Sequence, residues 1–186
     1  MRLNMNIALG KAEESKLSED ELKEVIYRLE SLVDKPNVEI LLNILGEARR
    51  FEYKHVMEKF LYYFENPQIP AVTLSILVEQ WGMGKQYSSY IKEMIKAEDN
   101  EDNGYVRSIA ISNGSYYFHE IRDEEILSVL LESYEETNDS QAYKGILTCL
   151  GLYPEEISSF DIHAKHLAWI NPDILKKAYQ LLKNKD

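Results

Sequence analysis

Cysteine is almost absent from the sequence. The only one, Cys149, lies in the apolar stretch 145–150, so we expect it to be buried as a small hydrophobe. One thiol cannot form a disulfide within the chain, which suits a reducing compartment. Long apolar runs are also missing: nothing approaches the roughly 18 consecutive apolar residues of a transmembrane helix, and residues 1–16 lack the apolar core of a secretory signal. These absences predict a cytoplasmic protein that does not enter a membrane.

Positive charge is scarce. The 186 residues include 21 lysines and arginines against 32 aspartates and glutamates, which gives a formal net charge of −11. A field of this sign repels phosphate backbones and anionic membranes. A basic protein is therefore the expected partner, and nucleic acid is not. The acidic residues gather in short runs, which are usually solvated faces and, at 123–125, also suit a helix N-terminus.

Strand-type alternation is missing, whereas apolar residues recur at helical spacing along most of the chain. Leu22, Val25, Ile26 and Leu29 form one stripe, with Ser18 placed to cap the helix. Comparable stripes lie at 38–45, 53–64, 72–81, 87–95, 106–111, 126–134, 142–152 and 174–182, and the five prolines fall between them or in a first turn. The pattern predicts an all-α protein with a flexible segment at 1–16 and a single helical domain at 17–186.

Four segments that lead into alternate helices resemble one another. They begin at Asp34, Gln68, Asp102 and Asp139, so their spacings are 34, 34 and 37 residues. Each carries an apolar residue four positions after its start, at Val38, Val72, Val106 and Tyr143. Glycines stand near the far ends of the same helices, where left-handed C-caps would suit them, at Gly46, Gly82, Gly114 and Gly151. Helix start and stop signals therefore recur in phase.

The third segment, with Asp102, Val106, Arg107 and Ala110, resembles the signature of HEAT-type helical repeats, and the fourth has Lys144 in place of the arginine. The resemblance covers about residues 34–184. It implies a short α-solenoid of about four stacked antiparallel helix pairs, with one layer of helices lining a concave face. The first two copies have Glu39 and Thr73 where a basic residue is expected, so no aspartate–arginine ladder is expected there. An irregular helical bundle is the alternative.

Motifs for metal binding and catalysis are incomplete. Asp99–Gly104 resembles the start of an EF-hand loop, but Ala110 occupies the position of its bidentate glutamate. His163 and His166 would share a helix face, yet two imidazoles do not make a zinc site, and a surface histidine pair is the simpler interpretation. No nucleophile elbow or phosphate loop is recognisable. We predict no catalytic residue, no metal site, no cofactor and no enzymatic activity.

Tyrosine is abundant, with 13 in the chain. Because tyrosine combines apolar area with a hydroxyl at low entropic cost, binding surfaces are rich in it. Our candidate partner-binding residues are Tyr62, Tyr63, Tyr87, Tyr90, Tyr116 and Tyr117, together with the acidic Glu132 and Glu136. The alternative for any one tyrosine is partial burial at a contact between helices. Trp81 is expected in the core.

These observations favour a non-catalytic, protein-binding helical-repeat module with an acidic, tyrosine-rich surface. One specific case is a toxin-neutralising immunity protein, which charge and size alone suggest. The alternative is a HEAT-like nucleic-acid-binding protein or a relative of DNA glycosylases, for which Arg49, Arg50, Lys54 and Lys85 would supply a local basic patch. A third hypothesis is a helper subunit of a larger assembly, which the sequence does not distinguish from the first.

Overall fold

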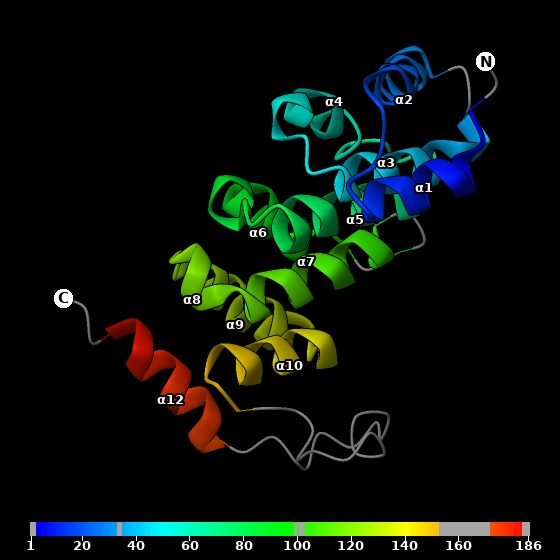
Figure 1. The fold of residues 1–186 in the computed structure, drawn as a ribbon. Coiled ribbons are helices and arrows are strands. Elements are labelled where there is room, and N and C mark those ends of the chain that lie inside the picture. The colour runs from blue at the N-terminus through cyan, green and yellow to red at the C-terminus, as the bar shows by residue number, and fades with distance from the viewer. Residues whose placement is uncertain (1–2, 33–34, 99, 101–102, 153–171, 184–186) are drawn as a thin grey trace. The chain divides into compact units, whose positions relative to one another are not determined.

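The computed structural model describes residues 3–32, 35–98, 100, 103–152 and 172–183 (Figure 1). Within these ranges the regular structure is entirely helical and no strand occurs, which confirms the all-α prediction. None of the described helices combines the length and the apolar character that crossing a bilayer requires.

The chain divides into two compact units, while the prediction of a single helical domain at 17–186 stays a prediction. Unit 1 comprises Met1–Met83 and Asn100–Val106, and unit 2 comprises Gly84–Asp99 and Arg107–Asp186. The sequence pattern did not reveal this division because the helical stripes continue through it without a linker-like stretch.

Unit 1 is built around α3. Its helices are α1 (Met5–Glu13), α2 (Glu19–Ser31), α3 (Val38–Glu47), α4 (Lys54–Glu58) and α5 (Gln68–Ser75), and α5 continues as a π-helical turn over Ile76–Gln80. Helices α1, α2 and α5 all pack against α3, whose side chains Leu41, Leu42, Ile44 and Leu45 are fully buried. Trp81 is also in the core, as predicted, and its indole N–H donates to the carbonyl of Gly46 at 3.0 Å.

The N-terminal segment differs from the expectation of a flexible 1–16, since Met5–Glu13 form α1. Asn4 caps the helix by accepting a hydrogen bond from the Ile7 amide at 3.3 Å. Ala8 and Ala12 lie 1% exposed against the rest of unit 1. Small alanines allow close packing but make a weak apolar stripe, so the sequence pattern did not mark this helix.

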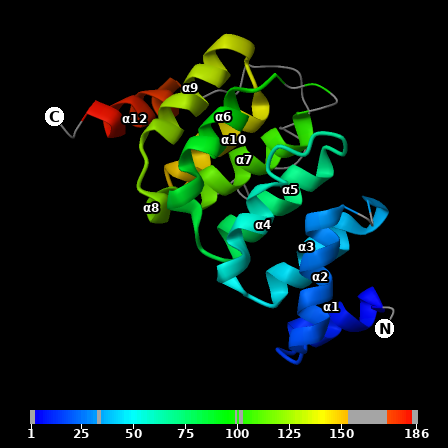
Figure 2. The same cartoon turned by 90° about the horizontal axis from the view of Figure 1, so that it is seen from above.

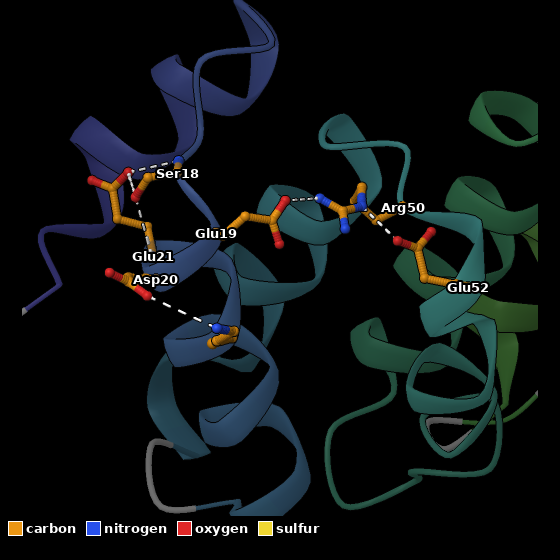
Figure 3. Close-up of polar contacts among 7 residues, drawn as sticks. Ser18, Glu19, Asp20, Glu21, Arg50 and Glu52 are labelled. Atoms are coloured by element: carbon orange, nitrogen blue, oxygen red, sulfur yellow. Dashed lines mark hydrogen bonds and ion pairs between the residues drawn. The ribbon is translucent and has the colours of Figure 1, made fainter.

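Ser18 caps α2, as predicted. The Glu21 amide donates to the Ser18 hydroxyl oxygen, and the Glu21 carboxylate accepts from the Ser18 amide at 3.0 Å, which completes a capping box (Figure 3). Hydrogen bonds from the Lys11 ammonium and from Ser18 lower the pKa of Glu21 to about 2. The start of α2 is therefore anchored to α1 as well as capped.

Unit 2 is built around α9. It contains α6 (Ser88–Lys96), α8 (Phe118–Ile121), α9 (Glu125–Thr137), α10 (Ser140–Cys149) and α12 (Pro172–Lys183), together with α7 (Gly104–Tyr116) from Arg107 onward. Helices α6, α10 and α12 pack against α9, and Figure 2 shows α12 alongside it. The inward stripe of α9 is buried at Ile126, Leu127, Val129, Leu130, Leu131 and Tyr134.

Of the four glycines that we expected to cap helix C-termini, two have a different role. Gly82 and Gly151 adopt the left-handed conformation after their helices, with φ of 65° and 70°, as expected for caps. Gly46 and Gly114 instead lie buried inside α3 and α7. A Cβ at Gly114 would come within 2.8 Å of Ile91 Cγ2 and 3.3 Å of Ile126 Cγ2. These two glycines permit close helix packing, which sequence position alone does not distinguish from capping.

The four repeat segments lead into α3, α5, α7 and α10. Their marker residues are not equally buried, however: Val38 and Val106 are 1% and 0% exposed, whereas Val72 and Tyr143 are half-buried. Each segment thus leads into a helix, but the helices begin at Val38, Gln68, Gly104 and Ser140, which are not equivalent positions of the segments, and the burial of the marker residue does not recur.

Replacing Gly114 tests the close packing of α7. We expect Gly114→Ala to destabilise the protein by about 1–3 kcal/mol, because the new methyl group must displace Ile91. Gly10→Ala in α1 is the matched control: its Cβ would meet no atom within 4 Å, so helix propensity should stabilise the fold by up to about 1 kcal/mol. Urea unfolding measures both, and equal effects of the two substitutions would contradict the packing role.

Candidate functional site

The predicted tyrosines occupy three kinds of position. Tyr62 and Tyr116 are 57% and 69% exposed, and Tyr63 and Tyr117 are half-buried. Tyr87 and Tyr90 are only 6% and 5% exposed and belong to the core of unit 2. The sequence contained the signal for this burial, because Tyr87, Tyr90, Ile91 and Met94 share the helical spacing of the apolar face of α6.

The predicted residues also belong to different parts of the chain. Tyr62 and Tyr63 follow α4 in unit 1, whereas Tyr116, Tyr117, Glu132 and Glu136 are residues of unit 2. Within unit 2, Glu132 and Glu136 line one groove and Tyr116 lines another. The structure therefore does not assemble the candidates into a single site.

Glu132 and Glu136 lie on one side of a groove of about 800 Å³ in unit 2, which we call the acidic groove. It runs between the end of α6, the second half of α9 and the start of α10. Its polar lining consists of Lys96, Glu98, Arg107, Glu132, Ser133, Glu136, Thr137, Asp139 and Ser140. The lining thus contains four carboxylates and two cations. The sequence pattern had not indicated that Glu98 lies near Glu132 and Glu136.

The second half of α9 concentrates negative charge where a helix tolerates it least. Glu132, Glu135 and Glu136 occupy its last two turns, and its last turn contains no basic residue. The macrodipole is negative at this end, and like charges three or four residues apart repel by about 0.2–0.5 kcal/mol per pair. These side chains therefore reduce the stability of their own helix.

Compensation for this charge is incomplete. The Lys96 ammonium lies 3.0 Å from Glu132, with both side chains more than half exposed, so the pair contributes little in water. The Tyr179 hydroxyl of α12 donates to Glu135, and this bond raises the pKa of Tyr179 to about 12. Glu136 and Glu98 form no ion pair with any residue in the described ranges.

A buried guanidinium lies beneath the acidic groove. The side chain of Arg107 is 5% exposed, and its Nε–H donates to the carbonyl of Ile95 at 3.0 Å. One terminal nitrogen donates to Ser133 Oγ at 2.7 Å and also to the Asp139 carboxylate. Asp139 in turn caps α10 by accepting from the Gln141 amide at 2.8 Å. Arg107 thus joins α6, α9 and the start of α10.

Two of the four residues of the predicted basic patch, Arg50 and Lys54, lie next to carboxylates. Arg50 contacts Glu19 and Glu52, each at 2.6 Å, as Figure 3 shows. Lys54 lies 3.3 Å from Glu58. These ion pairs neutralise much of the positive charge that a phosphate backbone would need.

Most of the metal-binding candidates fall outside the described residues. Asp99, Glu101 and Asp102 of the calcium-like loop lie there, as do His163 and His166. In the part of the chain that the structure describes, no three histidine, cysteine, aspartate or glutamate side chains are placed to hold a metal ion.

Comparison with known proteins does not identify a relative. No protein-family model matches the chain, and neither a curated protein nor a solved structure matches it. A function must therefore be inferred from the residues and their geometry.

Removing the Arg107 side chain tests its role beneath the groove. Arg107→Met leaves the Asp139 carboxylate 12% exposed without its partner, so we expect destabilisation of about 3–5 kcal/mol in urea unfolding. Lys59→Met breaks an exposed pair with Glu30, in which both side chains are about half exposed, and should cost at most about 1 kcal/mol. Similar losses for the two variants would show that Arg107 is an ordinary surface cation.

Cys149 is buried, as predicted, with 1% exposure. Burial raises the pKa of its thiol to about 12. At about pH 8 only about one thiol in ten thousand is then a thiolate, which is the form that reacts with disulfide reagents. Ellman's reagent should therefore not label the native protein and should release one equivalent per chain in guanidinium chloride. Rapid labelling of the native chain would mean that α10 opens readily.

Proposed function

We propose that this chain is a non-catalytic protein-binding module that engages a basic partner through the acidic groove. The observation that carries the proposal is the crowding of Glu132, Glu135 and Glu136 in the last two turns of α9. Charges that destabilise the helix bearing them are consistent with a role outside folding.

The charges around the groove support a protein partner rather than a nucleic acid. Glu98 and Glu136 are available to lysine or arginine side chains, and the net charge of −11 would attract a basic protein over several ångströms. Such attraction raises the association rate and weakens as salt increases. The pairing of Arg50 and Lys54 with carboxylates reduces the positive charge available to a phosphate backbone and so favours the protein partner over the DNA glycosylase-like alternative.

For the architecture, we infer that the helices are HEAT-like repeats. The arginine of the third repeat segment bonds to the aspartate that starts the fourth, as an aspartate–arginine ladder would require. The four segments each lead into a helix, and α3 has α1 and α5 packed against it. The half-buried Val72 and Tyr143 are the observations that fit the irregular-bundle alternative better.

The specific case we favour is a cytoplasmic immunity protein that neutralises a cationic toxin such as a nuclease. Its support is the acidic charge, the size of the chain and the acidic groove. In this proposal the chain itself supplies binding surface only, with no catalytic side chain and no cofactor.

Charge removal in the groove tests the proposal. The wild type, Glu132→Gln/Glu136→Gln and Glu13→Gln/Glu14→Gln are immobilised and exposed to extract of the source cells. Both double variants lose two charges, and each pair contains one glutamate next to a lysine: Glu132 with Lys96, and Glu14 with Lys16. We expect basic proteins to be retained by the wild type and the control and to be lost from the groove variant.

A partner identified in this way is then purified, and its binding is measured at increasing salt. The association rate should fall steeply between about 50 and 200 mM salt, because the Debye length shortens. Retention of the same proteins by both double variants would reject the acidic groove as the binding site. Retention of nucleic acid alone would favour the alternative function.

A further inference from the structure

A second groove in unit 2 has the opposite chemistry to the acidic groove. It has a volume of about 350 Å³ and lies between α7 and α10, two helices that Figure 1 shows side by side. Its lining is Ser108, Ile111, Ser112, Ser115 and Tyr116 from α7, and Gln141, Lys144, Gly145 and Thr148 from α10. We call it the α7–α10 groove.

Acidic residues are absent from both helices, although the whole chain contains 32 of them. The charged residues of α7 and α10 are Arg107, which is buried on Asp139, and Lys144. Lys144 is half-buried in the groove wall and has no ion pair with a described residue. Among the described residues that line this groove, Lys144 is therefore the only charged one.

Two hydroxyl groups on the groove floor already donate hydrogen bonds to carbonyls of their own helices. Ser115 Oγ donates to the Ile111 carbonyl at 2.6 Å, and Thr148 Oγ1 donates to the Lys144 carbonyl at 3.0 Å. A Cβ at Gly145 would come within 2.6 Å of Ser115 Oγ, so the two helices touch there. The groups that remain for a ligand are the Lys144 ammonium, the Gln141 amide, the Ser108 and Ser112 hydroxyls and the Tyr116 ring at the rim.

Tyr116 is the most exposed large apolar side chain in the described structure, at 69%. Its ring makes an edge contact with Tyr117, with centroids 5.1 Å apart. Contact surfaces in protein complexes are poor in aspartate and glutamate and rich in tyrosine, and antibody paratopes also use serine and glycine. This face shares these features, with Lys144 as its charged residue. An aromatic ring beside a groove is a common anchor in such surfaces.

We propose that the α7–α10 groove binds a polypeptide segment of a partner protein that presents an aspartate or glutamate next to an apolar side chain. The carboxylate pairs with Lys144, and the apolar neighbour packs on Tyr116. An isolated anion is the poorer occupant, because one partly exposed lysine contributes little to binding without the aromatic contact. Because the groove has room for only a few side chains, the bound segment contacts it over a short length.

Selection from a library of random dodecapeptides displayed on phage tests this inference. The bait is the full chain carrying Glu132→Gln/Glu136→Gln, which removes the acidic groove as a competing site for basic peptides. Failure of the proposed function would therefore not affect the result. We expect the enriched peptides to share an acidic residue adjacent to a leucine, isoleucine or aromatic residue.

Variants of the bait then locate the binding site of the selected peptides. Lys144→Glu and Tyr116→Ala should each weaken binding at least about tenfold, and Lys144→Gln should weaken it less than Lys144→Glu. The matched controls are Lys177→Glu on α12 and Tyr27→Ala on α2, where Tyr27 is 61% exposed. Circular dichroism confirms that each variant is folded.

Four results would overturn the inference, and the first three concern the selected peptides. These three are the absence of any enriched peptide, a basic consensus, and binding that Lys144→Glu and Tyr116→Ala leave unchanged. Loss of binding in the control variants to the same extent would also reject the groove as the site.

Discussion

Unit 2 is organised around the buried guanidinium of Arg107. This guanidinium donates hydrogen bonds to the Ile95 carbonyl at the end of α6, to the Ser133 hydroxyl on α9 and to the carboxylate of Asp139, which caps α10. A buried charge is tolerated only when its donors are paired, so the three helices must keep their relative positions for as long as Arg107 remains inside. The walls of the acidic groove belong to these same helices. The geometry of the groove therefore depends on a bond beneath it.

Charge is segregated by helix in unit 2. The second half of α9 carries three glutamates, whereas α7 and α10 carry none, and their lone unpaired cation is Lys144 among the described residues. Mixed charge on every face would favour stability and solubility without creating strong local fields. Segregation instead produces two surfaces of different chemistry, one suited to basic side chains and one to a carboxylate beside an apolar group. The two proposals arise from this separation and can fail independently.

Glycine and tyrosine residues show where the sequence pattern does not determine the structural role of a residue. Gly82 and Gly114 occupy similar places in their repeats, yet one is a left-handed cap and the other lies against Ile91 and Ile126. Tyr90 lies in a predicted helical stripe and Tyr116 follows one, yet Tyr90 is in the core and Tyr116 is the most exposed aromatic ring among the described residues. In each case the residue type permits two roles, and the neighbouring helix selects one. Likewise, α1 forms because Ala8 and Ala12 fit against the rest of unit 1, which no property of residues 1–16 alone could show.

The sequence by itself determined the helical class, the Ser18 cap, the buried Cys149 and Trp81, and the acidic charge. These follow from local spacing, from hydrogen bonds within a few residues and from composition, and none requires knowledge of a distant partner. Only the tertiary structure decided which carboxylates share a groove, which tyrosines face solvent and that Arg107 meets Asp139. Arg107 and Asp139 are 32 positions apart, so their contact depends on which helices pack together, and the periodicity of a single helix does not encode its neighbour.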